Sequence, residues 1–189
     1  MPRLVIGIDE VGRGPLAGPV VVCALALPAG LSVPRGDALP PLRDSKKLSA
    51  SQRFRWYEWI RRHPRIKFAV SRVYPRCIER LNISQAANLA ATRAAVRLVA
   101  SSPSFAAEGL RIFLDGGLYL SPRFELKNLK LTNLKTIIKG DEKITAIKLA
   151  SIVAKVVRDR FMDKLHKKYP QYGFAAHKGY GTAAHLAAI

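Results

Sequence analysis

Acidic residues are scarce in this chain. Its 189 residues include 13 Asp and Glu against 32 Lys and Arg, which gives a formal net charge of +19 at pH 7. A surplus of this size points to a polyanionic partner, either nucleic acid or an anionic membrane. It also means that acidic residues gathered beside an apolar run call for a specific explanation.

Long apolar segments and cysteines are also lacking. The longest apolar run, residues 19–30, covers about half a bilayer, so no membrane partner is expected. The first apolar run is cut short by Asp9 and leaves no signal-peptide core. Two cysteines, Cys23 and Cys77, are too few for a disulfide framework or a zinc site. The expected location is the reducing cytoplasm.

Apolar runs and turn residues predict a single α/β domain over residues 1–189, with a basic, loop-like segment at about 168–189. Short runs rich in Val, Ile and Leu predict strands at 4–8, 19–27, 66–74, 110–114 and 129–138. Capping residues followed by helical apolar spacing predict helices at about 49–62, at about 82–100 and at about 142–167. Three early strands followed by alternating helices and strands indicate a mixed sheet flanked by helices.

Two of the predicted helices show an apolar face. In the second helix this face holds Leu89, Thr92, Val96 and Val99. In the last helix it holds Ile147, Ala150, Ala154, Val157, Phe161 and Leu165. The opposite, solvated face of the last helix is expected to carry Lys148, Lys155, Arg158, Arg160 and Lys164.

Four of the acidic residues stand apart from the rest because they follow apolar runs. Asp9 and Glu10 end the first predicted strand, Asp115 ends the fourth, and Asp141 begins the last helix. Such junctions of sheet edge and loop are where α/β proteins usually build their sites. Each has a purely structural alternative: Asp141 can cap a helix and Asp115 can begin a turn.

The adjacent pair Asp9 and Glu10 is harder to explain structurally. Successive strand residues point to opposite faces, so at least one carboxylate is directed inward, where an unpaired charge is costly. Mg²⁺ or Mn²⁺ would offset that cost. Converging carboxylates could hold two such ions about 4 Å apart, a geometry that suits in-line displacement at phosphorus. Residue types alone therefore favour a metal-dependent phosphodiester enzyme.

Six segments occur in a distinctive order, and together they resemble bacterial ribonuclease HII of the type 2 ribonuclease H family. They are GIDEVGRGPLAGPVV, DSKKLS, LDG, KGD, ASIVAKVVRDR and YPQYGFAAHKGYGT. The resemblance runs from about residue 4 to residue 186. It implies a ribonuclease H-like fold with a mixed five-stranded sheet flanked by helices. It also implies Mg²⁺- or Mn²⁺-dependent hydrolysis of the RNA strand in RNA–DNA hybrids.

The resemblance implies a second substrate, duplex DNA that contains a single ribonucleotide. Incision on the 5′ side would leave a 3′-hydroxyl and a 5′-phosphate. The metal-binding and catalytic carboxylates of the family correspond to Asp9, Glu10, Asp115 and Asp141, with Asp9 expected to bridge the two ions. One ion would activate water and the other would stabilise the leaving 3′-oxygen.

The resemblance also implies which residues contact the substrate. Gly12, Arg13 and Gly14 would bring backbone groups close enough to recognise the 2′-hydroxyl, although a plain turn is the alternative. Tyr180 would stack on the sugar beside the ribonucleotide, although a surface anchor is the alternative.

Two further segments of the resemblance are expected to meet the phosphate backbone. Asp44, Ser45 and Lys46 match one such segment, for which the alternative is a loop that leads into a helix. Ser151 and Lys155 lie one turn apart on the last helix, for which the alternative is a solvated face.

Rival interpretations remain. A ribonuclease HIII-like hybrid nuclease shares the carboxylates, but the Gly12-Arg13-Gly14 segment favours ribonuclease HII. A catalytically inactive nucleic-acid-binding domain would also suit the charge, but it would gain nothing from four acids that face phosphates. Another two-metal nuclease or strand transferase on this fold is a third option. The expected partners are RNA–DNA hybrids and ribonucleotide-containing duplex DNA, bound by a monomer.

Overall fold

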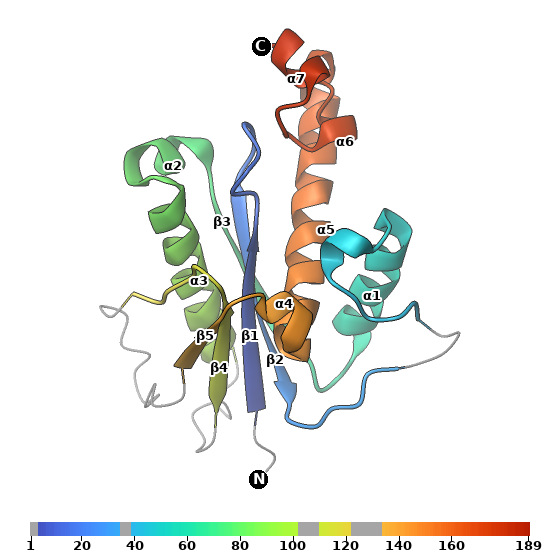
Figure 1. Ribbon diagram of the computed structural model, residues 1–189, viewed down its shortest axis with the longest axis vertical. Coiled ribbons are helices and arrows are strands. Elements are labelled where there is room, and N and C mark those ends of the chain that lie inside the picture. The colour runs from blue at the N-terminus through green and yellow to red at the C-terminus, as the bar shows by residue number, and fades with distance from the viewer. Residues whose placement is uncertain (1–3, 35–38, 102–109, 122–133) are drawn as a thin grey trace.

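A five-stranded mixed sheet with helices on both faces forms the centre of the molecule (Figure 1). The computed structural model describes residues 4–34, 39–101, 110–121 and 134–189. Its strands are β1 (Leu4–Val11), β2 (Val20–Pro28), β3 (Lys67–Val73), β4 (Arg111–Asp115) and β5 (Leu134–Ile137). The α/β fold predicted from the sequence is confirmed. The first part of the predicted fifth strand, residues 129–133, lies outside the described residues.

The strand order is β3-β2-β1-β4-β5, which places β1 at the centre. Strand β2 pairs antiparallel with both β1 and β3, whereas β4 pairs parallel with β1 and with β5. In the parallel ladder Ile8 lies opposite Leu114. The residues that follow, Asp9 and Asp115, therefore meet at the same end of the sheet, although 106 positions separate them in the chain.

The first and second long helices begin where their capping residues predict. Ser49 and Gln52 form a complete capping box at the start of α1, and the Asn82 side chain accepts a hydrogen bond from the Gln85 amide at the start of α3. The α-helices are α1 (Ala50–Arg62), α2 (Pro75–Leu81), α3 (Ile83–Ala100), α4 (Gly140–Lys143), α5 (Thr145–Lys168), α6 (Phe174–His177) and α7 (Ala183–Ala187). In the described residues, the 3₁₀ turn η1 (Ser45–Lys47) precedes α1 and the 3₁₀ turn η3 (Pro170–Tyr172) joins α5 to α6.

Two apolar layers cover the sheet. Helix α3 packs on one face together with Ile6, Ile8 and Leu114. Helices α1 and α5 pack on the other face against Cys23 and Leu25 of β2 (Figure 1). Every residue of β2 is buried, because layers cover both of its sides. No helix in the described part of the chain is both long enough and apolar enough to cross a membrane.

Helix α3 contacts the sheet through alanines, which differs from the sequence prediction. Its most buried positions include six alanines and Leu98. Of the four residues predicted to form the apolar face, Thr92 is buried, whereas Leu89, Val96 and Val99 are only partly buried. Small side chains let the helix lie close to the strands, so the larger residues fill the margins instead.

Three other features of the elements differ from what the sequence indicated. Helix α2, with Pro75 in its first turn, was not expected at all. The last helix is interrupted at Ile144, whose backbone is extended, so α4 and α5 are separate. The segment after Tyr169 is not a loop: it holds η3, α6 and α7, and it buries Phe174 and His185. Thr182 caps α7, and all three elements have too few residues to show an apolar period.

Candidate active site

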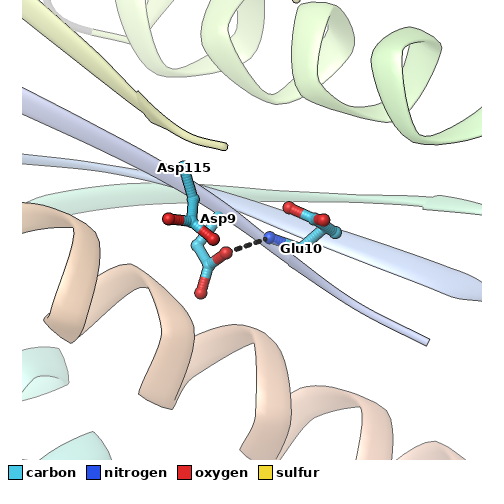
Figure 2. A group of neighbouring side chains, drawn as sticks. All are labelled: Asp9, Glu10 and Asp115. Atoms are coloured by element: carbon cyan, nitrogen blue, oxygen red, sulfur yellow. Dashed lines mark hydrogen bonds between the residues drawn. The ribbon is translucent and has the colours of Figure 1, made fainter. Parts of the chain in front are cut away.

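Asp9 is held at the centre of the sheet, beneath helix α5. A Cβ atom added to Gly7 would lie 2.2 Å from the backbone of Ala146 and Ile147, so this glycine lets the start of α5 rest directly on β1. The Asp9 side chain is 4% exposed. Its Oδ1 accepts a hydrogen bond of 2.8 Å from the Glu10 amide (Figure 2).

Burial raises the pKa of Asp9 well above its ordinary value, and the nearby charges of Glu10 and Asp115 raise it further. A hydrogen bond from the Ser151 side chain opposes this rise. Burial also raises the pKa of Glu10, although Arg13 opposes that change. The folded protein therefore keeps negative charge here at a free-energy cost, which a bound cation would offset.

Glu10 lies beside Arg13 and has one oxygen without a partner. Its Oε1 atom lies 3.3 Å from the Arg13 Nη1 atom, which donates a hydrogen bond to it. Its Oε2 atom is buried and accepts no hydrogen bond from the described residues. A buried carboxylate oxygen left in this condition is unusual and costly, so it marks a place for a cation.

Asp115 joins the other two carboxylates from the neighbouring strand. Asp9, Glu10 and Asp115 each offer an oxygen, and these three atoms all lie within 4.8 Å of one another (Figure 2). We call these three residues the carboxylate cluster. The Asp9 and Asp115 carboxylates lie next to each other, while the Glu10 side chain leaves the strand in another direction. Oxygen-only ligands, one of them unpartnered and buried, fit Mg²⁺ or Mn²⁺.

Asp141 lies next to the carboxylate cluster but does not belong to it. The amide of its neighbour Gly140 donates a hydrogen bond of 2.6 Å to Asp115 Oδ1, which fixes α4 beside the strand end. Asp141 is 8% exposed; burial raises its pKa, and the charge of Asp115 raises it further. Among the described residues, three of the four predicted acids thus come within mutual ligand distance, and Asp141 lies beside them.

Residues 12–14 leave the end of β1 beside these acids. Gly12 has a φ of 101°, a conformation that favours glycine, and it is buried. Gly14 is exposed, and a Cβ atom placed there would lie 3.8 Å from the Tyr180 ring. The Arg13 side chain turns back to Glu10, and its Nη2 atom donates a hydrogen bond of 3.0 Å to Ser84.

Tyr180 lies beside Gly14 and is 44% exposed. Its carbonyl oxygen lies 2.9 Å from Nδ1 of the buried His185, and its amide donates to the His177 carbonyl. Arg13, Gly14 and Tyr180 are exposed, and Gly14 adjoins the Tyr180 ring; we call residues 12–14 together with Tyr180 the candidate recognition surface. The short helices after Tyr169 therefore fix the backbone on which Tyr180 stands.

The residues expected to contact phosphates fall into two environments. Ser45 and Ser151 are buried and share a hydrogen bond of 2.8 Å, and Ser151 in turn bonds Asp9, so these hydroxyls link η1 to the carboxylate cluster. Lys46 is exposed beside them, and the Asp44 side chain accepts a hydrogen bond from its amide.

Lys155 is not free to extend into solvent in this structure. Its Nζ atom lies 2.7 Å from Asp159 Oδ1, and both side chains are mostly buried. Arg53 approaches the other Asp159 oxygen at 3.6 Å. The predicted phosphate contact of Lys155 would therefore require it to leave this ion pair.

The environment of Arg158 differs from the one that the sequence predicts. This arginine was placed on the solvated face of the last helix, yet its exposure is 0%. Its three guanidinium nitrogens donate to backbone carbonyl oxygens of Ala17, Pro19 and Lys178. The signal was present, because Arg158 lies four positions after Ala154 and seven after Ser151, on the buried side of α5.

Comparison with known proteins identifies relatives over nearly the whole chain. Residues 6–189 match the family model described as Ribonuclease HII. A Ribonuclease HII from Nitratidesulfovibrio vulgaris is 46% identical, over 100% of this chain and 81% of its own length. One from Delftia acidovorans is 43% identical, over 100% and 71%. The crystal structure of ribonuclease H2 from Pyrococcus horikoshii is 25% identical, with a TM-score of 0.69 over 97% of this chain and 83% of that one.

Proposed function

Because the chain belongs to the ribonuclease HII family of metal-dependent endoribonucleases, which cut the RNA strand of RNA–DNA hybrids, we propose a narrower activity. The protein incises duplex DNA on the 5′ side of a single embedded ribonucleotide. It does so with two divalent ions and leaves a 3′-hydroxyl and a 5′-phosphate.

The observation that carries this proposal is the carboxylate cluster on a strongly basic chain. Three acidic side chains lie within 4.8 Å of one another, and one buried oxygen of Glu10 has no partner in the described structure. A net charge of +19 attracts the phosphate backbone, while the cluster recruits cations to one phosphate.

Asp9, Glu10, Asp115 and Asp141 are the residues that would hold the ions. When bound, Mg²⁺ or Mn²⁺ would polarise the scissile phosphate and lower the pKa of the attacking water. Ser151 orients Asp9 through its hydrogen bond, and the Gly140 amide orients Asp115. Arg13 holds Glu10 on one side and leaves its second oxygen available.

Substrate recognition would use the candidate recognition surface. Gly14 is exposed and has no side chain, so the backbone at this point can approach the 2′-hydroxyl of a ribonucleotide closely. The half-exposed Tyr180 ring lies beside it and can stack on the next sugar. Lys46, exposed beside the cluster, would contact a phosphate.

An end-labelled DNA duplex with one internal ribonucleotide tests the proposal. With Mg²⁺ or Mn²⁺ we expect one cut on the 5′ side of the ribonucleotide, and with EDTA we expect none. The matched all-DNA duplex should stay intact, and a long RNA–DNA hybrid should be cut at many positions. Cleavage of the hybrid without any cut at the single ribonucleotide would contradict the narrower activity and would leave the family assignment in place.

The packing of the sheet also bears on domain organisation and oligomeric state. We propose that residues 1–189 act as a single ribonuclease H-like domain and as a monomer, because both apolar layers pack on one sheet. Light scattering of the purified protein, with and without a hybrid, would give a mass near 20.8 kDa for the free chain. A dimer mass would contradict this.

A further inference from the structure

Arg158 joins two segments that are far apart in the sequence. Its Nε atom donates to the Pro19 carbonyl at 3.1 Å, and its Nη2 atom donates to the Ala17 carbonyl at 2.9 Å. Its Nη1 atom donates to the Lys178 carbonyl at 2.9 Å. One buried side chain on α5 thus binds the loop that follows β1 and the segment that carries Tyr180.

The two segments also touch each other at this point. The amides of Leu16 and Ala17 both donate to the Gly179 carbonyl, at 2.9 and 3.2 Å. Gly14 lies two residues before this contact and Tyr180 one residue after it. The distance between the two halves of the candidate recognition surface is therefore set where Arg158 binds.

Glycines shape the space that the guanidinium occupies. A Cβ atom on Gly12 would lie 2.6 Å from the Arg158 Nε atom, and one on Gly18 would lie 3.2 Å from its Nη2 atom. Both glycines have positive φ, of 101° and 93°. The glycine before Arg13 is thus required by the packing of Arg158, independently of any approach by a substrate.

We propose that Arg158 is a positioning residue, which holds residues 12–14 and Tyr180 at the separation that recognises the junction between a ribonucleotide and DNA. This inference rests on the proposed function, in which these residues contact the substrate. A planar guanidinium can donate to three carbonyls in different directions at once. A lysine ammonium at the end of a flexible chain cannot hold all three.

A positioning role predicts a change in selectivity, with metal use left intact. The three hydrogen bonds of Arg158 go to backbone carbonyls and none goes to the carboxylate cluster. Loss of Arg158 should therefore separate the two halves of the surface and leave the cluster in place. A long hybrid presents a ribonucleotide at every position and so depends less on recognition of one junction.

The main experiment compares Arg158→Met with Arg158→Lys and with Arg160→Met. Arg160 lies two residues further along α5, is exposed and stacks on Phe54 and Tyr57, so its substitution controls for the lost charge. For Arg158→Met we expect kcat/KM to fall about 100-fold on the single-ribonucleotide duplex and about 10-fold or less on a long hybrid. Arg158→Lys should lie between this variant and the native protein, and Arg160→Met should keep the native ratio of the two rates.

Two further readouts separate positioning from a general structural role. The rise in melting temperature on adding Mn²⁺ should be the same in Arg158→Met as in the native protein. The double variant Arg158→Met, Tyr180→Ala should lose no more selectivity than the worse single variant, because both changes remove the same recognition. Additive losses, or equal losses on both substrates, would overturn the proposal.

Gly179→Ala provides a second route if Arg158→Met fails to fold. Its Cβ atom would lie 2.4 Å from the Ala17 carbonyl oxygen, so it would push the two segments apart in a protein that retains the Arg158 side chain. The same loss of selectivity is expected, and an unchanged ratio of the cleavage rates on the two substrates would overturn the inference.

The outcomes distinguish the two proposals. If the native protein fails to cut at a single ribonucleotide, it is the proposed function that fails. If the native protein cuts and the variants keep its ratio, only the inference fails.

Discussion

The carboxylate cluster and the candidate recognition surface adjoin each other, but they are held in place differently. Asp9 and Asp115 stand at the ends of neighbouring parallel strands, in a register that backbone hydrogen bonds maintain. Residues 12–14 and Tyr180 stand on connecting segments, which side-chain contacts from Arg158 join. The cluster should therefore tolerate changes nearby, whereas the recognition surface should depend strongly on one buried residue and on the few backbone hydrogen bonds beside it.

Burial disfavours the charged form in both regions and therefore shifts the pKa values in opposite directions. In the cluster it raises the pKa of Asp9 and Glu10, since each carboxylate loses water and faces like charges. At Arg158 it lowers the pKa of the guanidinium, which faces carbonyl dipoles. The cluster gains from a bound cation, whereas Arg158 is already satisfied within the protein.

The largest effect is expected from removing the charge of Asp9. Asp9→Asn should lower the cleavage rate by about 10⁴-fold or more, because the ligands act as a unit. Binding to a hybrid should persist or strengthen, since a carboxylate that repels phosphate is lost. Rate measurements and a binding titration check this, with Glu58→Gln on α1 as a control in which a remote acid is removed. Loss of binding together with activity would contradict a catalytic role.

A smaller and selective effect is expected from Tyr180. Tyr180→Ala should reduce cleavage at a single ribonucleotide by about 10- to 100-fold, the range expected for one lost stacking contact. Cleavage of a long hybrid should fall less. Tyr169→Ala, which removes another partly exposed tyrosine at the end of α5, is the control. If the cleavage rate fell equally on both substrates, Tyr180 would not act selectively, and the recognition surface would not differ in role from the cluster.

Substitution of two lysines should distinguish an exposed ammonium group from one that is held in an ion pair. Lys46→Ala should weaken binding several-fold and reduce the slope of log affinity against log salt by about 1. Lys155→Ala should change the slope less, because Lys155 is paired with Asp159. Binding titrations between about 50 and 200 mM salt measure both slopes. A larger change for Lys155 would show that its ion pair opens when substrate binds.

The pH dependence of stability should show the smallest effect. The pKa values of Asp9, Glu10 and Asp141 are raised in the folded protein, so the folded state binds these protons more tightly than the unfolded chain does. Their stabilising contribution is complete below an ordinary carboxyl pKa of about 4 and is lost as the pH rises through the raised values. Melting curves in EDTA should therefore decline over this range, and Asp9→Asn should decline less. A bound divalent ion should reverse the trend, because it favours the charged forms.

Local patterns in the sequence were sufficient for much of the fold. The apolar runs located the described parts of all five strands to within a few residues, and Ser49 and Asn82 marked the starts of α1 and α3. Helix α2 and the short helices after Tyr169 were missed because each has fewer than eight residues, too few to show an apolar period. The break at Ile144 was also missed, since the apolar stripe begins only at Ile147 and carries no information about the residues before it.

For the site, the sequence by itself determined which acids end strands, how basic the chain is, and to which family its motifs belong. These properties depend on residues that are close together in the chain. Only the tertiary structure decided that β4 pairs beside β1, that Ser45 bonds Ser151, and that Arg158 is buried. Each of these depends on contacts across many intervening residues. Burial of apolar surface brings such segments together, and the polar groups buried with them must then find hydrogen-bond partners that local periodicity does not reveal.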